Sequence, residues 1–148
     1  MHLKRTNSEN PHFIDLVKQL DADLAQRDGE DHSFYSQFNK IDNIMYALVA
    51  YIDQKPIGCG AIKENQSDSM EVKRMYVLPE FRGQGIAKTI LLELEIWAKE
   101  LGYAKCVLET GKRQPEAIQL YKSKGYKTTA TYGQYIGIEN SICFEKIL

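Results

Sequence analysis

Residues 75–89 read MYVLPEFRGQGIAKT, a strand-like run followed by a short glycine-bearing turn and the start of an amphipathic helix. Glycine lets the backbone come close to a ligand. The first N–H groups of a helix have no partner within the helix, and they carry a partial positive charge. The segment therefore predicts an anion cradle that accepts a phosphate or pyrophosphate.

Two nucleotide-binding motifs share this order of glycine turn and helix, and both fit poorly. A phosphate-binding loop of the Walker type requires glycine directly before the lysine, whereas Ala87 precedes Lys88. A dinucleotide-binding fingerprint requires a third glycine at the position that Lys88 occupies. The cradle therefore belongs to another kind of anion site.

Length and composition predict one globular domain over residues 1–148. A chain of 148 residues can bury roughly two thirds of its unfolded surface. Hydrophobic residues make up 43% and charged residues 26%, which is typical of a soluble domain. No apolar run approaches the roughly 20 residues that cross a bilayer. The N-terminal segment is polar, so we expect a cytoplasmic protein without a membrane partner.

The charge balance and the cysteines exclude further function classes. Nineteen basic and twenty acidic residues give a net charge of −1, which argues against nucleic acid as a partner. Cys59, Cys106 and Cys143 are widely spaced, and each lies in an apolar stretch. This pattern predicts reduced thiols in the core rather than disulfides or a zinc site.

Hydrophobic periodicity predicts an alternation of strands and helices. Strands are expected at residues 3–5, 44–52, 57–63, 69–77, 106–108, 126–131 and 141–148. Helices are expected from Asn10-Pro11 to about residue 27, over 32–39, over 85–101, and from Gln114-Pro115 to Gly125. The economical fold is an α/β (α+β) domain with a mixed, mostly antiparallel central sheet of six or seven strands and helices on both faces.

Two motifs resemble one family. Residues 82–87, RGQGIA, resemble the Arg/Gln-x-x-Gly-x-Gly/Ala signature of the GCN5-related N-acetyltransferase (GNAT) superfamily. Residues 117–126, AIQLYKSKGY, resemble its Ala-x-x-Leu-Tyr-x-x-x-Gly-Phe/Tyr motif. The resemblance is firm over residues 57–126, loose in the final strand, and limited to element order in the first 50 residues.

The resemblance implies the same architecture and a direct transfer of the acetyl group of acetyl-CoA to an amine. Acetyl-CoA and an amine acceptor are the expected partners, with no metal and no covalent enzyme intermediate. A homodimer is expected from family habit only. A coenzyme-A-binding sensor or regulatory module without turnover is the alternative function.

The resemblance also assigns residues to the coenzyme. The expected coenzyme-binding residues are Met75, Tyr76, Val77, Arg82, Gly83, Gln84, Gly85, Ile86, Ala87, Lys88, Gln114 and Tyr121. Gln114 stands where many members carry an asparagine. Arg82 and Lys88 are expected to contact phosphate or cap the helix, with an ordinary solvated charge as the alternative.

Three residues are expected to carry the chemistry. The Val77 N–H matches the donor that faces the acetyl oxygen, and an aimed N–H stabilises the developing oxyanion. Tyr121 matches the tyrosine that protonates the leaving thiol, with helix packing as the alternative. Glu71 is the candidate base, because it stands six residues before Val77, the offset of the base in some protein-acetylating members.

Strand alternation predicts that Glu71, Lys73, Met75 and Val77 share one face of the sheet. Glu71 could instead pair with Lys73 or Arg74, and Glu109 or water is the alternative base. The roles of Lys73 and Arg74 and the identity of the acceptor stay open. Phe34, Tyr35 and the loop 132–137 are candidates to line an amine pocket, with surface packing as the alternative.

Overall fold

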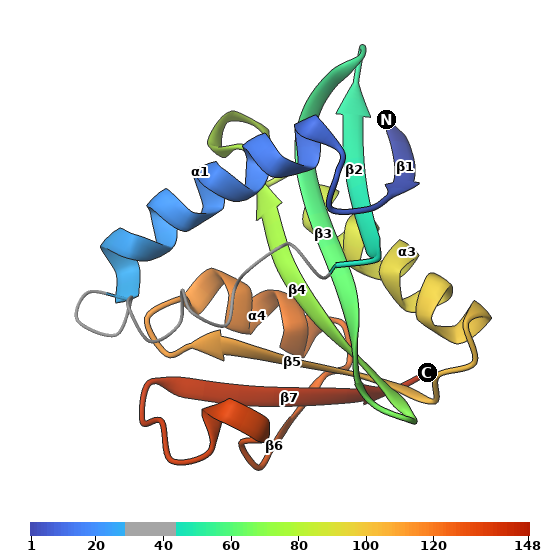
Figure 1. The fold of residues 1–148 in the computed structure, drawn as a ribbon. Coiled ribbons are helices and arrows are strands. Elements are labelled where there is room, and N and C mark those ends of the chain that lie inside the picture. The colour runs from blue at the N-terminus through green and yellow to red at the C-terminus, as the bar shows by residue number, and fades with distance from the viewer. Residues whose placement is uncertain (29–43) are drawn as a thin grey trace.

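A computed structural model describes residues 1–28 and 44–148 (Figure 1). The strands are β1 (His2–Thr6), β2 (Tyr46–Ile52), β3 (Lys55–Gln66), β4 (Ser69–Val77), β5 (Lys105–Gly111), β6 (Lys127–Thr129) and β7 (Ser141–Ile147). The helices are α1 (Pro11–Asp28), α3 (Ile86–Glu100) and α4 (Pro115–Ser123), with 3₁₀ turns η2 (Pro79–Phe81) and η3 (Gly133–Tyr135). The helix predicted over 32–39, with Phe34 and Tyr35, lies outside the described residues.

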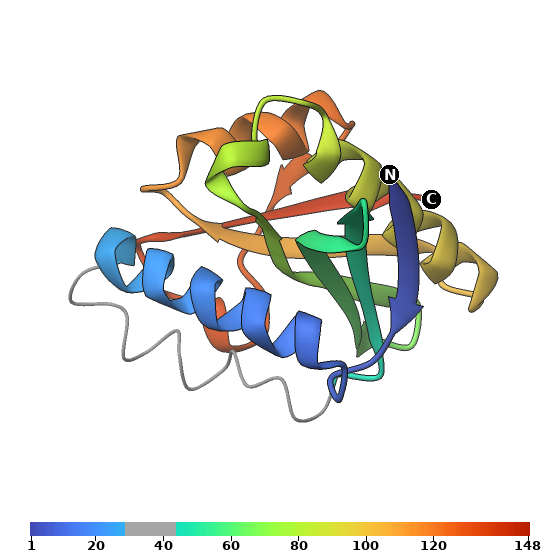
Figure 2. The same cartoon turned by 90° about the horizontal axis from the view of Figure 1, so that it is seen from above.

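One seven-stranded sheet has the order β1-β2-β3-β4-β5-β7-β6. Within the described chain β4 and β5 run parallel, and the other neighbouring strands are antiparallel. Viewed from above, α1 covers one face of the sheet, and α3 and α4 cover the other (Figure 2). The predicted mixed sheet with helices on both faces is confirmed.

Local sequence signals set the helix boundaries. The Asn10 side-chain oxygen accepts hydrogen bonds from the backbone N–H groups of His12 (2.9 Å) and Phe13 (3.1 Å). Pro11 follows at the first helical position, where the missing N–H costs nothing. The apolar stripe of α1, with Phe13 and Leu16, packs on the sheet. The predicted start of this helix is confirmed.

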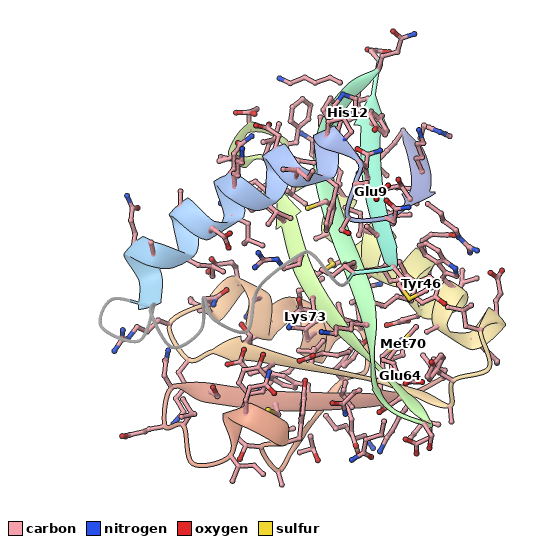
Figure 3. The ribbon with its side chains drawn as sticks, viewed as in Figure 1. Glu9, His12, Tyr46, Glu64, Met70 and Lys73 are labelled. Atoms are coloured by element: carbon pink, nitrogen blue, oxygen red, sulfur yellow. The ribbon has the colours of Figure 1, made fainter. Side chains whose placement is uncertain are left out.

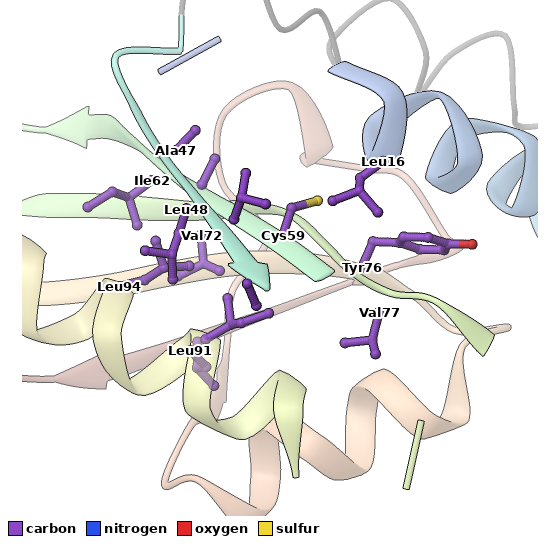
Figure 4. Close-up of a cluster of buried hydrophobic side chains, with 14 of the residues drawn as sticks. Leu16, Ala47, Leu48, Cys59, Ile62, Val72, Tyr76, Val77, Leu91 and Leu94 are labelled. Carbon is purple, nitrogen blue, oxygen red and sulfur yellow. The ribbon is translucent and has the colours of Figure 1, made fainter. Parts of the chain in front are cut away.

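Helix α3 carries the other half of the core. Ile90, Leu91 and Leu94 are buried against the middle strands, as the close-up shows for the two leucines (Figure 4). Leu101, directly after the end of the helix at Glu100, is 38% exposed. Glu95 is buried within the helix, and its carboxylate accepts a hydrogen bond from Lys146 Nζ at 2.9 Å.

A β-bulge in β4 overturns the predicted alternation. The register shifts between Cys59, opposite Tyr76, and Ala61, opposite Lys73, and Arg74 has a φ of 59°. The extra residue changes which side chains share a face. The expectation that Glu71, Lys73, Met75 and Val77 all point to one face is therefore wrong.

The two faces of β4 can be assigned from their contacts. A Cβ added to Gly60 would meet the side chains of Met75 and of Ile90 and Leu94 of α3. Met75 therefore lies on the face of the sheet that α3 covers. Ile62 lies two residues beyond Gly60 on the same face, so its register partner Val72 also faces α3. The neighbours of Val72, Glu71 and Lys73, consequently point to the α1 face.

Candidate functional site

The site lies where β4 and β5 separate. Their parallel pairing joins residues 69–71 to residues 105–107, and the two strands then diverge as Figure 1 shows. A cavity of about 500 Å³ occupies this gap. It runs from the predicted cradle, along β4, to the α1 face. The lining includes Leu20, Asp23, Glu71, Lys73, Arg74, Met75, Tyr76, Val77, Arg82, Gly83, Gly85, Ile86, Ala87, Lys88, Glu109, Gln114, Tyr121 and Tyr135.

The cradle is formed by η2, the glycine turn and the first turn of α3. Gly83 and Gly85 both have φ of 80°, a left-handed conformation that favours glycine. A Cβ at either position would meet nothing within 4 Å, so the backbone here is open to a ligand. Gly85 directly precedes α3, and the first helical residues, Ile86 to Lys88, line the cavity, so the unpartnered N–H groups of this helix start lie at the cavity. These residues fit a pyrophosphate group.

Arg82 connects the cradle to the end of β4. Its Nε donates to the Val77 carbonyl at 2.9 Å, and its guanidinium lies over the Tyr76 ring at 5.4 Å. Arg82 and Lys88 both line the cavity, where their charges suit an anion. Gln84 lies in the same turn but is not among the described residues that line the cavity.

The Val77 backbone points into the gap. Opposed residues of antiparallel strands alternate between hydrogen-bonded and non-bonded pairs. Leu78 N donates to the Ile57 carbonyl at 2.9 Å, so Val77, opposite Gly58, belongs to a non-bonded pair. Its N–H and C=O therefore point away from β3, toward the side where β5 has diverged. This orientation suits the predicted oxyanion donor.

Tyr121 reaches the cavity from α4. The helix begins at Pro115, directly after Gln114, and both Gln114 and Tyr121 line the cavity. The Tyr121 ring packs against Tyr126 at 5.7 Å between centroids, so it also has the packing role named as the alternative. Burial raises the pKa of the Tyr121 phenol, and the nearby Glu109 carboxylate raises it further. The phenol therefore keeps its proton at neutral pH.

Glu71 lies at the fork between the two strands. Its Oε2 accepts a hydrogen bond from the Tyr132 hydroxyl at 2.8 Å. Its Oε1 lies 3.8 Å from Lys73 Nζ, an ion pair longer than a hydrogen bond. The predicted pairing with Lys73 is therefore present, and Glu71 lines the cavity as well.

Lys73, the last paired residue before the bulge, and Arg74, within the bulge, both line the cavity. The Lys73 side chain is 8% exposed and lies near the gap between β4 and β5 (Figure 3). Burial lowers the pKa of its ammonium, while Glu71 acts in the opposite direction. Arg74 is 3% exposed and pairs with Asp21 of α1 at 3.1 Å. Arg74 thereby joins the bulge to the helix that covers it.

Glu109 and Tyr135 complete the α1 end of the cavity. The Glu109 carboxylate accepts a hydrogen bond from the Ser141 hydroxyl at 2.6 Å. The loop 132–137 was a candidate to line an amine pocket, and its Tyr135 does line the cavity. The hydrogen bond from Tyr132 to Glu71 was not predicted. The only signal was two aromatic residues in a glycine-rich loop.

The cysteines take no part in this cavity. Cys59, Cys106 and Cys143 are buried free thiols, as predicted. Burial raises the pKa of Cys59 and of Cys106 to about 12. Such thiols are protonated at neutral pH and poor nucleophiles.

Residues 1–28 and 44–148 hold no cluster of three or more His, Cys, Asp or Glu side chains suited to a metal ion. No helix in the same residues combines the length and apolarity needed to span a bilayer.

Comparison with known proteins identifies relatives over most of the chain. Residues 14–126 match the model of the acetyltransferase (GNAT) family. An uncharacterized N-acetyltransferase of Schizosaccharomyces pombe is 32% identical over 132 residues, which is 82% of this chain and 81% of the relative.

Solved structures share the fold. The crystal structure of a Klebsiella pneumoniae protein assigned as an acyl-CoA N-acyltransferase superposes on this chain with a TM-score of 0.84 at 28% identity. The superposition covers 99% of this chain and 97% of the other. An N-acetyltransferase of Thermoplasma acidophilum, solved in complex with coenzyme A, has a TM-score of 0.72 at 21% identity and full coverage of both chains.

Proposed function

Because this chain belongs to the acetyltransferase (GNAT) family, we propose that it transfers the acetyl group of acetyl-CoA directly to a primary amine of a small molecule or peptide. The chain is an acetyl-CoA-dependent N-acetyltransferase. Direct transfer requires that coenzyme and acceptor be bound together in a ternary complex. The arrangement of the cavity supports this finer proposal.

The observation that carries the proposal is the continuity of the cavity. One end is the anion cradle at Gly83 and Gly85, and the other end holds Glu71 and Glu109. The Val77 N–H points into the gap between the two ends. A cosubstrate anchored by its pyrophosphate and an amine entering from the α1 face would therefore meet at Val77.

In this proposal three groups act in the acyl transfer. The Val77 N–H would stabilise the oxyanion that forms when the amine attacks, a contribution of about 3 kcal/mol for one such donor in well-studied enzymes. Glu71 would take the proton of the attacking amine. Tyr121, protonated at neutral pH, would donate a proton to the leaving thiolate. The buried, protonated cysteines fit a reaction without a thioester intermediate on the enzyme.

The cradle and its neighbours would hold the coenzyme. In this proposal Met75, Tyr76 and Val77 line the pantetheine arm with their backbone, and Gln114 bonds the coenzyme from the start of α4. The diphosphate lies at the glycine turn near Arg82 and Lys88. Acetyl-CoA supplies the activated acetyl thioester, and no metal is required.

The experiment is a thiol-release assay with acetyl-CoA against amino acids, polyamines, aminoglycosides and lysine peptides, with coenzyme binding measured by calorimetry. Amine-dependent release would establish the acceptor class. Tight coenzyme binding without release across the panel would favour the sensor function. Absence of coenzyme binding would contradict the role of the cradle.

We also propose a location, a domain organisation and an assembly for this protein. Free buried thiols are typical of a reducing compartment, so we propose a cytoplasmic location. We propose that residues 1–148 act as one domain, since all seven strands join one sheet. A homodimer remains a prediction, which light scattering of the purified protein would test.

A further inference from the structure

A hydrogen bond connects the candidate base to a loop 61 residues away. The Tyr132 hydroxyl donates to Glu71 Oε2 at 2.8 Å. Glu71 lies at the fork of β4 and β5, whereas Tyr132 precedes η3, between β6 and β7. A hydrogen bond to a charged acceptor is among the stronger ones in proteins. The bond therefore fixes one of the two carboxylate oxygens.

The loop that carries Tyr132 is held by its own backbone hydrogen bonds. Tyr135 N donates to the Tyr132 carbonyl at 3.0 Å, Ile138 N to the Tyr135 carbonyl at 3.1 Å, and Ser141 N to the Ile138 carbonyl at 3.1 Å. The rings of Tyr132 and Tyr135 meet edge to face at 5.6 Å and pack with Cys143 of β7. Tyr132 is thus anchored to the sheet.

The Tyr132 hydroxyl stays protonated, so it can always donate a hydrogen bond. Burial is the largest effect on its phenol, and the Glu71 carboxylate adds to it, so that the pKa is raised far above the ordinary value. The hydroxyl keeps its proton at every pH at which a carboxylate would take a proton from an amine acceptor. Its role is to hold Glu71 and not to exchange protons with the acceptor.

We propose that Tyr132 is a positioning residue for this reaction, which fixes Glu71 through Oε2 so that Oε1 is the oxygen that takes the proton of the acceptor amine. The proposal rests on the proposed function of Glu71. With Oε2 occupied by the tyrosine, Oε1 is the oxygen on the side of Lys73, which lines the cavity. Residues that hold a catalytic group in one orientation are commonly needed for full rate.

The first test is the kinetics of Tyr132→Phe. This variant keeps the ring and removes the hydroxyl, so turnover with a high-pKa amine should fall about tenfold, the cost of losing a hydrogen bond to a charged group. The KM for acetyl-CoA should not change, because the cradle lies at the other end of the cavity. The matched control is Tyr103→Phe, since Tyr103 donates to Glu64 at 2.6 Å outside the cavity lining. This control should retain full turnover.

The second test is a double-mutant cycle. In a Glu71→Gln background the Tyr132→Phe change should cost less than twofold, because the base that it positions is already gone. An equal loss in both backgrounds, or full turnover of Tyr132→Phe, would overturn the proposal.

A third readout does not depend on turnover. Crystal structures of the wild type and of Tyr132→Phe should show the Glu71 carboxylate displaced in the variant, and an unchanged carboxylate position would overturn the proposal. If the wild type acetylates no amine, the proposed function fails, whereas this comparison still decides whether Tyr132 positions Glu71.

Discussion

At the scale of single residues, the site depends on where a few charges are buried. The bulge brings the two consecutive cations Lys73 and Arg74 to the cavity, and the carboxylates of Glu71 and Asp21 offset their charges. Sequence patterning named Glu71 and Val77 as candidates through their spacing, and both line the cavity. It named the loop that contains Tyr132 but could not predict the bond to Glu71, because a contact across 61 residues depends on how the last loop folds back over the sheet.

The two candidate bases can be separated by substitution. Glu71→Gln should lower turnover about a hundredfold for an alkylamine, which is almost wholly protonated at pH 7, and much less for an α-amine with a pKa near 8. Glu109→Gln should lower turnover only severalfold, because in the proposal Glu71 takes the proton and Glu109 contributes only negative charge at the same end of the cavity. Both rates are measured by thiol release. A larger loss in Glu109→Gln than in Glu71→Gln would reverse the assignment.

At the scale of elements, local signals predicted most of the fold. The asparagine-proline pair at 10–11 starts α1, and the glycine turn starts α3. Strand β4 was predicted with its observed limits, yet its faces were not. A bulge at glycine or asparagine would leave a trace in sequence, whereas Arg74 at φ 59° gives none. Tertiary contacts, including the ion pair with Asp21, sustain that conformation.

The cradle gives a prediction with a close control. Gly85→Ala places a Cβ at φ 80°, which costs about 1 kcal/mol and displaces the turn before α3. The KM for acetyl-CoA should rise about fivefold by the same energy scale. Gly102→Ala makes the same kind of change at φ 96°, beyond the other end of α3. It should lower the melting temperature similarly and leave the KM unchanged. An equal rise in KM in both variants would show that the effect is not local to the cradle.

At the scale of the whole molecule, burial shifts many titrating groups in the same direction. Burial raises the pKa of Cys59 and Cys106 from 9.0 to about 12, and that of Cys143 from 9.0 to about 11. It also raises the pKa values of four tyrosines above 10.0: Tyr121, Tyr126, Tyr132 and Tyr135. The pKa of Lys73 shifts in the opposite direction, because burial lowers it from 10.5.

These shifts predict a loss of stability in alkali. Above about pH 9 the unfolded chain releases protons that the folded chain keeps, so the free energy of unfolding falls as pH rises, by about 1.4 kcal/mol per pH unit for each such group. The stability that each thiol contributes is complete below pH 9.0 and is lost by about pH 12 for Cys59. Denaturant unfolding between pH 7 and pH 11 measures the slope. Cys59→Ala removes one of these groups. The free energy of unfolding of the variant should therefore fall less steeply above pH 9 than that of the wild type, whatever the stability of the variant at pH 7. Identical slopes for wild type and variant would mean that the Cys59 thiol ionises equally in both states, contrary to its burial.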